Sequence, residues 1–260
     1  MKYDSTLSIG GLAYLCVTVR GARALQSLLK KARDCDLPYL ILGKGTKMRV
    51  RDGVIRGRVV HLDEGGAQLV TGYELRAGGG VPLSQVSQLA AAHGLGGLTF
   101  AIGIPGSLGG AVLMNAGAYG GEMSDVIKEV TFLDENLDFP TAKATDLSYS
   151  YRHSYFMDHP GCGLVEAVLE LWAQASCEIE AEMADFTKRR KEKQPLAYPS
   201  AGSTFQRPPG CYTGPLIRQA GLAGPGLGGA HVSKQPTGFV LHRAAGTARD
   251  VLPHHQHNTY

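Results

Sequence analysis

Short segments of alternating or helically spaced apolar residues cover most of the first two thirds of the chain. Leu25, Leu28, Leu29 and Ala32 recur on one face of a helix expected over residues 23–34. Pro82 opens a second predicted helix that ends near Gly94, and a third helical pattern covers residues 179–188. The predicted strands are residues 9–19, 38–42, 54–62, 68–70, 74–77, 126–133 and 165–172. This mixture predicts an α+β protein with many short strands.

Residues 103–120, GIPGSLGGAVLMNAGAYG, hold too many glycines for an ordinary helix or strand and too many small apolar residues for a flexible linker. Glycine permits positive φ and the close approach of another group. Glycines that precede a helix leave outward N–H groups, which suit an anion such as phosphate. A second glycine-rich turn, residues 43–47, follows a predicted strand. From spacing alone, a tightly packed turn that binds nothing explains residues 103–120 equally well.

The composition is that of a globular protein with a mild positive charge. The 260 residues are 43% hydrophobic and 19% charged, with a net charge of +3. The chain lacks the basic stripe with aromatic residues that is typical of nucleic-acid binding. No apolar run approaches the roughly 18 residues that cross a bilayer, so neither nucleic-acid binding nor membrane insertion is expected. The basic run at residues 188–193 contains Glu192 and is interpreted as the solvated end of a helix.

The five cysteines are scattered, odd in number and without a Cys-x-x-Cys pair. This pattern argues against a disulfide framework or a zinc site, and it favours buried thiols in a reducing, cytoplasmic compartment. Near the end of the chain, Thr247 begins the first turns of a capped helix, which Pro253 interrupts. The three histidines of residues 254–260 are interpreted as part of a frayed tail rather than a metal site. No metal is therefore predicted.

Several segments, in order along the chain, resemble the signature motifs of the UDP-N-acetylenolpyruvoylglucosamine reductase family. Residues 103–120 carry one of them, G-I-P-G-S-L-G-G-A followed by M-N-A-G-A-Y-G. The other segments are residues 6–11 (TLSIGG), 38–47 (PYLILGKGTK), 151–156 (YRHSYF), 193–196 (KQPL), 199–205 (PSAGSTF), 228–233 (GGAHVS) and 238–239 (GF). The resemblance is to the shorter form of the family, which lacks an inserted substrate loop.

The resemblance implies an α+β architecture with a bipartite FAD-binding fold of the vanillyl-alcohol-oxidase (PCMH) type and a C-terminal substrate domain. We expect one FAD-binding lobe over residues 1–62, a second over residues 63–176 and the substrate-binding domain over residues 177–260. The implied cofactor is non-covalent FAD, because neither His61 nor His93 has a context for covalent attachment. NADPH is the implied co-substrate and a UDP-sugar the implied substrate, without an obligate protein partner.

The implied reaction reduces UDP-N-acetylglucosamine enolpyruvate to UDP-N-acetylmuramate in peptidoglycan precursor synthesis. Reduced flavin supplies a hydride to C3 of the enolpyruvyl ether, and a proton is added at C2. By the resemblance, donors to the FAD pyrophosphate and groups along the cofactor come from Gly43, Gly45, Thr46, Gly106, Ser107, Gly109, Gly110, Asn115, Ala116 and Gly117.

The resemblance also assigns the catalytic residues. Arg152 is the expected cation that polarises the substrate carboxylate and enolate, and the alternative is a surface salt bridge. Ser203 is the expected proton donor to C2, and the alternative is a turn serine or a helix N-cap. Tyr151 and Arg190 are expected substrate contacts, although a core tyrosine and a solvated helix face explain the same residues.

Several positions depart from the family pattern. Lys44 and Lys47 stand where the first phosphate turn carries asparagine, and Arg207 stands before Pro208 in place of asparagine. Gln235-Pro236 replaces a pair of the Lys-His or Gln-His type that precedes Gly238 in the family pattern. The family continues past the helix at Thr247 with a segment that supplies a catalytic glutamate. We therefore expect a truncated C-terminus, and the alternative function is an impaired or inactive FAD-binding relative.

Overall fold

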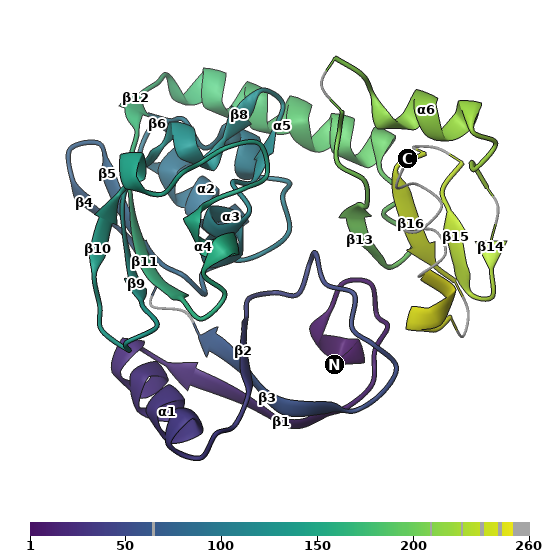
Figure 1. Ribbon diagram of the computed structural model, residues 1–260. Coiled ribbons are helices and arrows are strands. Elements are labelled where there is room, and N and C mark those ends of the chain that lie inside the picture. Colours follow the sequence, from purple (N-terminus) through teal and green to yellow (C-terminus); the bar gives the residue numbers. More distant parts are fainter. Residues whose placement is uncertain (64–65, 209, 225, 235–236, 244–245, 252–260) are drawn as a thin grey trace. The chain divides into compact units, whose positions relative to one another are not determined.

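The computed structural model describes residues 1–63, 66–208, 210–224, 226–234, 237–243 and 246–251 (Figure 1). The chain divides into two compact units, which are described separately here. Unit 1 comprises Met1–Tyr14, Gly45–Arg56 and Arg189–Tyr260, and unit 2 comprises Leu15–Lys44 and Gly57–Lys188. The lobe boundaries expected after residues 62 and 176 stay predictions.

An antiparallel five-stranded sheet forms the centre of unit 2. Its strands, in spatial order, are β10 (Thr141–Lys143), β9 (Ile127–Leu133), β11 (Gly163–Glu170), β5 (Glu74–Gly78) and β4 (Ala67–Thr71). Successive residues of a strand point to opposite faces. Ala167 and Leu169 of β11 therefore enter the core, while Glu166 pairs with Arg76 of β5 at 2.8 Å.

Helices pack against this sheet and complete the main core of unit 2. They are α2 (Leu83–Ala92), α3 (Leu108–Leu113) and α4 (Tyr155–Asp158), with the 3-10 turns η2 (Thr99–Ala101), η3 (Met123–Asp125) and η4 (Ala144–Asp146). Unit 2 also contains two short antiparallel strand pairs. They are β6 (Leu95–Gly96) with β12 (Trp172–Ala173), and β7 (Gly117–Ala118) with β8 (Gly121–Glu122). Leu83, Val86 and Ala90 are buried, which confirms the helix predicted after Pro82. Helix α3 contacts β5, β11, α2 and α4, so both of its ends are set by the core.

A smaller sheet has the order β1 (Ala13–Arg20), β3 (Ile55–Asp63) and β2 (Tyr39–Leu42), with β2 and β3 parallel. Helix α1 (Ala22–Asp34) confirms the helix predicted over residues 23–34. Leu25, Leu29 and Ala32 of its predicted apolar face are buried, whereas Leu28 is only partly buried. Leu25 and Leu29 pack with Val60 and Leu133. Because α1 rests on both sheets, it fixes the position of β2 within unit 2.

Unit 1 contains an antiparallel sheet in the order β13 (Ser200–Ser203), β16 (Phe239–His242), β15 (Ala230–Val232) and β14 (Gly226–Leu227). Helix α6 (Thr213–Gln219) and the turn η1 (Lys2–Asp4) belong to the same unit. Leu7 and Ile9 share a buried core with Val240 and Val251. Segments from distant parts of the sequence therefore hold this sheet in place.

The helix start predicted at Thr247 is confirmed. Thr247 Oγ1 accepts from Asp250 N at 3.3 Å, and Asp250 Oδ2 accepts from Thr247 N at 2.8 Å, which is a reciprocal capping box. Asp52 accepts hydrogen bonds from the backbone N–H groups of Ala248 and Arg249. The predictions for residues 254–260 and for Gln235-Pro236 lie outside the described residues.

Helix α5 (Ser176–Lys193) carries the third predicted helical pattern. The basic run at residues 188–193 forms its last turns and is mostly exposed, which confirms the interpretation as a solvated helix end. None of the described helices is both long and apolar enough to cross a membrane.

The strand predicted over residues 9–19 is wrong at its start, because β1 begins at Ala13. Ile9 is buried in the core of unit 1 instead. Gly10 has a φ of +133°, and a Cβ at Gly10 would lie 2.6 Å from the Cβ of Val50. A Cβ at Gly11 would overlap backbone oxygens of residues 52 and 53. The two segments approach so closely that only glycine fits.

The strand predicted over residues 165–172 is two strands. β11 ends at Glu170, and Trp172 pairs with Gly96 in a different sheet. Leu171 N donates to Tyr73 O at 3.0 Å as the chain changes sheets. The apolar alternation continues through this point, so the pattern alone could not separate the two strands.

The expectation of buried thiols is wrong for four of the five cysteines. Cys162 is buried, whereas Cys16, Cys35, Cys177 and Cys211 are exposed. All five cysteines lie in described segments and are free thiols there.

Candidate functional site

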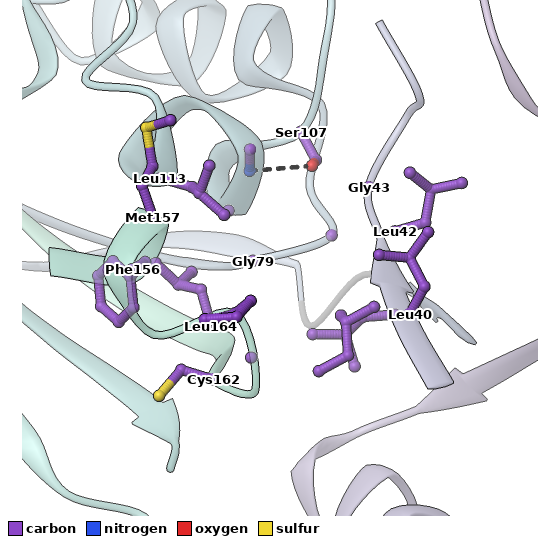
Figure 2. A pocket seen from close by; sticks show the side chains of 17 residues that line it. Leu40, Leu42, Gly43, Gly79, Ser107, Leu113, Phe156, Met157, Cys162 and Leu164 are labelled. Carbon is purple, nitrogen blue, oxygen red and sulfur yellow. Dashed lines mark hydrogen bonds between the residues drawn. The ribbon is translucent and has the colours of Figure 1, made fainter. Parts of the chain in front are cut away.

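A cavity of about 320 Å³ lies in unit 2. Figure 2 shows Leu40, Leu42 and Gly43 on one side, and Leu113, Phe156 and Leu164 on the other. Its full lining is Leu40, Ile41, Leu42, Gly43, Leu62, Gly79, Gly80, Ser107, Gly109, Gly110, Leu113, Phe156, Met157, Pro160, Cys162, Gly163 and Leu164. The volume lies at the lower end of the 300–1,000 Å³ range that is typical of small-molecule sites.

Glycine backbone makes up much of the cavity wall, and close contacts explain why. A Cβ at Gly43 would overlap Ser107 Oγ, and a Cβ at Gly79 would overlap the carbonyl oxygen of Leu164. A Cβ at Gly163 would lie 2.6 Å from the Cδ1 of Ile41. Side chains at these positions would therefore strain the packing around the cavity.

The first turn of α3 borders the cavity, but three of its backbone N–H groups already donate hydrogen bonds within the protein. Leu108 N donates to Val81 O at 2.8 Å, and Gly109 N donates to Gly79 O at 2.7 Å. Gly110 N donates to Ser107 Oγ at 3.4 Å (Figure 2). The expectation of outward N–H groups is therefore wrong at these three positions. The Ser107 hydroxyl can still donate its own proton, and Gly106, at φ +133°, is outside the lining.

The C-terminal end of α3 is closed by a Schellman motif. Asn115 has a φ of +42°, Ala116 N donates to Ala111 O at 2.8 Å, and Asn115 N donates to Val112 O at 3.3 Å. The Asn115 side chain is fully buried. Its Nδ2 donates to Ser150 O at 3.0 Å, and its Oδ1 accepts from Ser124 N at 3.0 Å. Asn115, Ala116 and Gly117 do not line the cavity.

Arg152 is held by this same turn. Its Nη1 donates to Asn115 O at 2.9 Å, and its Nη2 donates to Gly117 O at 2.6 Å. Arg152 has a φ of +58°, and its guanidinium lies 4.9 Å from the ring centroid of Tyr151. No carboxylate in the described segments forms an ion pair with Arg152, so the alternative of a surface salt bridge is wrong.

Ser203 is exposed at the end of β13 in unit 1. Its Oγ donates to Phe205 O at 3.4 Å, and Thr204 N donates to Gly238 O at 2.8 Å. The helix N-cap alternative for Ser203 is wrong, because the next described helix, α6, begins at Thr213. The serine instead follows an irregularity in the ladder, since the β13–β16 register shifts between Ser200 and Ser203.

The turn at Gly45 and Thr46 belongs to unit 1 and is fixed by the N-terminal segment. Gly45 has a φ of +61°, and a Cβ there would overlap Asp4 O. Thr6 N donates to Gly45 O at 3.3 Å, and Thr6 Oγ1 contacts Thr46 O at 3.3 Å. The packing of unit 1 therefore requires glycine at position 45 whether or not a ligand is bound.

The remaining predicted substrate contacts differ in exposure. Tyr151 is 51% exposed, so it is not a core tyrosine. Arg190 is half-buried near the end of α5.

Four predicted cofactor residues, Gly43, Ser107, Gly109 and Gly110, line one cavity. The lining residues that follow the ends of β5 and α4, above all Gly79 and Cys162, were not predicted from the sequence. The run Gly78-Gly79-Gly80 was a usable signal for the first. Burial raises the pKa of the Cys162 thiol, and the carboxylates of Glu135 and Asp134 add to the shift.

The cavity wall has features that suit part of a bound cofactor. Glycine backbone at Gly43, Gly79 and Gly109 leaves room for close approach, Ser107 offers a hydroxyl, and leucine side chains supply an apolar wall. Residues 14–136 match the family described as "FAD binding domain". The fold and the cavity thus define a flavoprotein, with the predicted FAD-binding architecture and FAD as the predicted cofactor.

Residues 194–257 match a second family, "UDP-N-acetylenolpyruvoylglucosamine reductase, C-terminal domain". A protein of that name from Syntrophomonas wolfei is 42% identical over 253 residues, which is 97% of this chain and 84% of the relative. One from Clostridium perfringens is 43% identical over 244 residues, 94% of this chain and 80% of the relative. The chain belongs to the UDP-N-acetylenolpyruvoylglucosamine reductase family.

A solved structure supports the same assignment. The UDP-N-acetylenolpyruvylglucosamine reductase of Thermus caldophilus superposes with a TM-score of 0.83 at 32% sequence identity, covering 98% of this chain and 91% of that one. The predicted family and fold class are confirmed.

Proposed function

We propose that this chain reduces UDP-N-acetylglucosamine enolpyruvate to UDP-N-acetylmuramate with NADPH, in the synthesis of peptidoglycan precursors. One observation carries the proposal: the glycine-lined cavity of unit 2 occurs in a chain that is 42% identical to a reductase of this name over 253 residues. Hydride transfer from NADPH to C3 of the enolpyruvyl ether is the chemistry that FAD would supply when bound.

The chain's own residues hold the cofactor in this proposal. Gly43, Gly109 and Gly110 allow close approach at the cavity wall, and the Ser107 hydroxyl donates to a phosphate oxygen. Gly45, Thr46 and Gly106 belong to the same two glycine-rich turns, and Asn115, Ala116 and Gly117 continue along the cofactor. FAD is bound without a covalent link.

Arg152 stabilises the negative charge that develops on the substrate. A guanidinium carries five N–H donors in a planar fork. Two of them are used on the carbonyl oxygens of Asn115 and Gly117, which leaves three to bind the carboxylate and the enolate oxygens. Removing one such preorganised donor typically costs about 10²–10³ in rate.

Ser203 donates its Oγ proton to C2 of the substrate. The hydroxyl is exposed in unit 1, so solvent can return a proton to it after each turnover. Tyr151 contacts the substrate beside Arg152, and Arg190 binds a phosphate of the UDP group. The lobes over residues 1–62 and 63–176 hold FAD, and residues 177–260 hold the UDP-sugar.

The chain works alone in the cytoplasm in this proposal. Its five cysteines form no disulfide in the described structure, which supports a reducing compartment. No protein partner is needed for a reaction whose donors and cations all come from one chain.

The test is steady-state NADPH oxidation by the purified, flavin-loaded protein. We expect oxidation to depend on the enolpyruvyl UDP-sugar, with one product molecule for each NADPH. A matched assay with UDP-N-acetylglucosamine, which lacks the enolpyruvyl group, should show no substrate-dependent oxidation. A stable flavin spectrum without turnover would contradict the reductase and favour the alternative of an inactive FAD-binding relative.

A further inference from the structure

Two side chains tie the turn at residues 45–47 to the strand that carries Ser203, all within unit 1. Thr6 Oγ1 contacts Thr46 O at 3.3 Å and Ser200 O at 2.8 Å. Lys47 Nζ donates to Ser203 O at 2.6 Å across 156 residues of sequence. A turn expected to meet the cofactor phosphates is thus joined to both ends of β13 (Ser200–Ser203).

Strand β13 needs such support, because its pairing with β16 is irregular. The register shifts between the pairs Ser200–Leu241 and Ser203–Phe239, and Gly202 has a φ of +76°. Irregularities of this kind bend a strand and re-aim its side chains. The bond from Lys47 is made at the residue where the irregular segment ends.

Among the described residues, the Ser203 hydroxyl makes a single, long hydrogen bond, to Phe205 O at 3.4 Å. Its place is therefore set chiefly by its backbone. A hydrogen bond from an ammonium group is charge-assisted and stronger than a neutral one. The ammonium of Lys47 also lies close to Gly202, since a Cβ there would be 3.6 Å from Nζ.

We propose that Lys47 is a positioning residue for Ser203. It fixes the Ser203 carbonyl and thereby the direction of the hydroxyl, and its fixed positive charge favours the alkoxide that forms as the proton leaves. The proposal rests on the proposed function, in which Ser203 is the proton donor. It gives a purpose to the lysine that stands where the family pattern carries asparagine.

The test separates the two half-reactions of the flavin-loaded protein by stopped-flow absorbance. In Lys47→Met we expect reoxidation of the reduced flavin by the enolpyruvyl substrate to slow about 10- to 100-fold, as a small misplacement of a reacting group does. Reduction by NADPH should keep the wild-type rate, because Ser203 takes no part in it. Lys47→Arg, which keeps the charge and the donor, should restore most of the reoxidation rate. Lys30→Gln, an exposed charge change on α1, is the matched control and should change neither step.

Each other outcome overturns the proposal. Equal slowing of both half-reactions would show a general structural effect. Normal reoxidation at saturating FAD with weaker FAD binding would assign Lys47 to the cofactor. Equal losses in Lys44→Gln and Lys47→Met would assign the effect to the charge of the turn. If Lys47→Met does not fold, Lys47→Gln carries the same comparison. Failure of wild-type reoxidation would instead contradict the proposed function itself.

Discussion

Replacing Asn115 with alanine removes a buried amide that joins the turn after α3 to residues 124 and 150 of unit 2. The side chain donates to Ser150 O and accepts from Ser124 N, both at 3.0 Å, and it is 0% exposed. The residue also has a φ of +42°, which asparagine tolerates and alanine does not. The substitution therefore leaves two backbone groups unpaired and strains the turn that closes α3.

The expected loss of stability follows from these contributions. Each unpaired backbone group costs about 1–3 kcal/mol, and left-handed backbone at alanine costs about 1–2 kcal/mol. The low ends sum to about 3 kcal/mol, a large part of the 5–15 kcal/mol that stabilises a typical domain. Asn115→Gly loses the same hydrogen bonds without the strain. It should therefore be about 1–2 kcal/mol more stable than Asn115→Ala.

Urea unfolding followed by tryptophan fluorescence measures this directly. The chain has a single tryptophan, Trp172, which lies in unit 2, so the signal reports on the unit that contains Asn115. A loss below about 1 kcal/mol in Asn115→Ala would refute the hydrogen-bond argument. Equal stabilities of the alanine and glycine variants would refute the argument from φ.

Three further predictions concern the site and the C-terminal helix. Arg152→Lys keeps the charge but loses the two-carbonyl brace, so single-turnover flavin reoxidation should fall about 10²–10³-fold with flavin content unchanged. Because its pKa is raised, the Cys162 thiol should react with N-ethylmaleimide more slowly than the exposed cysteines. Bound FAD should slow this alkylation further. Peptide mass spectrometry measures the extent of alkylation at each cysteine. The N–H groups of Thr247 and Gly229 hold the pKa of Asp250 below its usual value. Its contribution to stability is present above the unfolded pKa and is lost as pH falls through the folded one, so Asp250→Asn should flatten the acid limb of a pH–stability curve.

These three predictions have clear contrary results. Wild-type reoxidation in Arg152→Lys would show that the carbonyl brace is dispensable. Equal alkylation of Cys162 with and without FAD would place the cofactor outside the cavity. An unchanged acid limb in Asp250→Asn would show that the Asp250 carboxylate does not contribute to the pH dependence of stability.

The sequence predicted those elements whose stability is local. Helix α1 follows from the spacing of Leu25, Leu28, Leu29 and Ala32. All of these residues are buried except Leu28, which is partly buried. The start of β1 was missed because Gly10 and Gly11 are packed against residues 50–53, a contact that no local pattern records. The break after Glu170 was missed because Trp172 keeps the alternation while pairing with a different strand.

The site divides in the same way. Glycine-rich turns are visible in the sequence, so Gly43, Ser107, Gly109 and Gly110 could be proposed together, and they line one cavity. The sequence could not show whether the N–H groups of this turn are available to a ligand. Leu108 N and Gly109 N donate to carbonyl groups about 30 residues earlier. The brace from Asn115 to Arg152 and the reach of Lys47 to Ser203 are likewise long-range contacts. Only the folded chain reveals them.

This flavoprotein delivers its reducing equivalents to an enolpyruvyl UDP-sugar. The most direct measurement is a single turnover, in which NADPH-reduced, flavin-loaded protein is mixed without oxygen with UDP-N-acetylglucosamine enolpyruvate. We expect the yellow flavin absorbance to return at a rate set by substrate concentration, with one UDP-N-acetylmuramate formed per flavin. Flavin that stays reduced, with the substrate recovered unchanged, would contradict it.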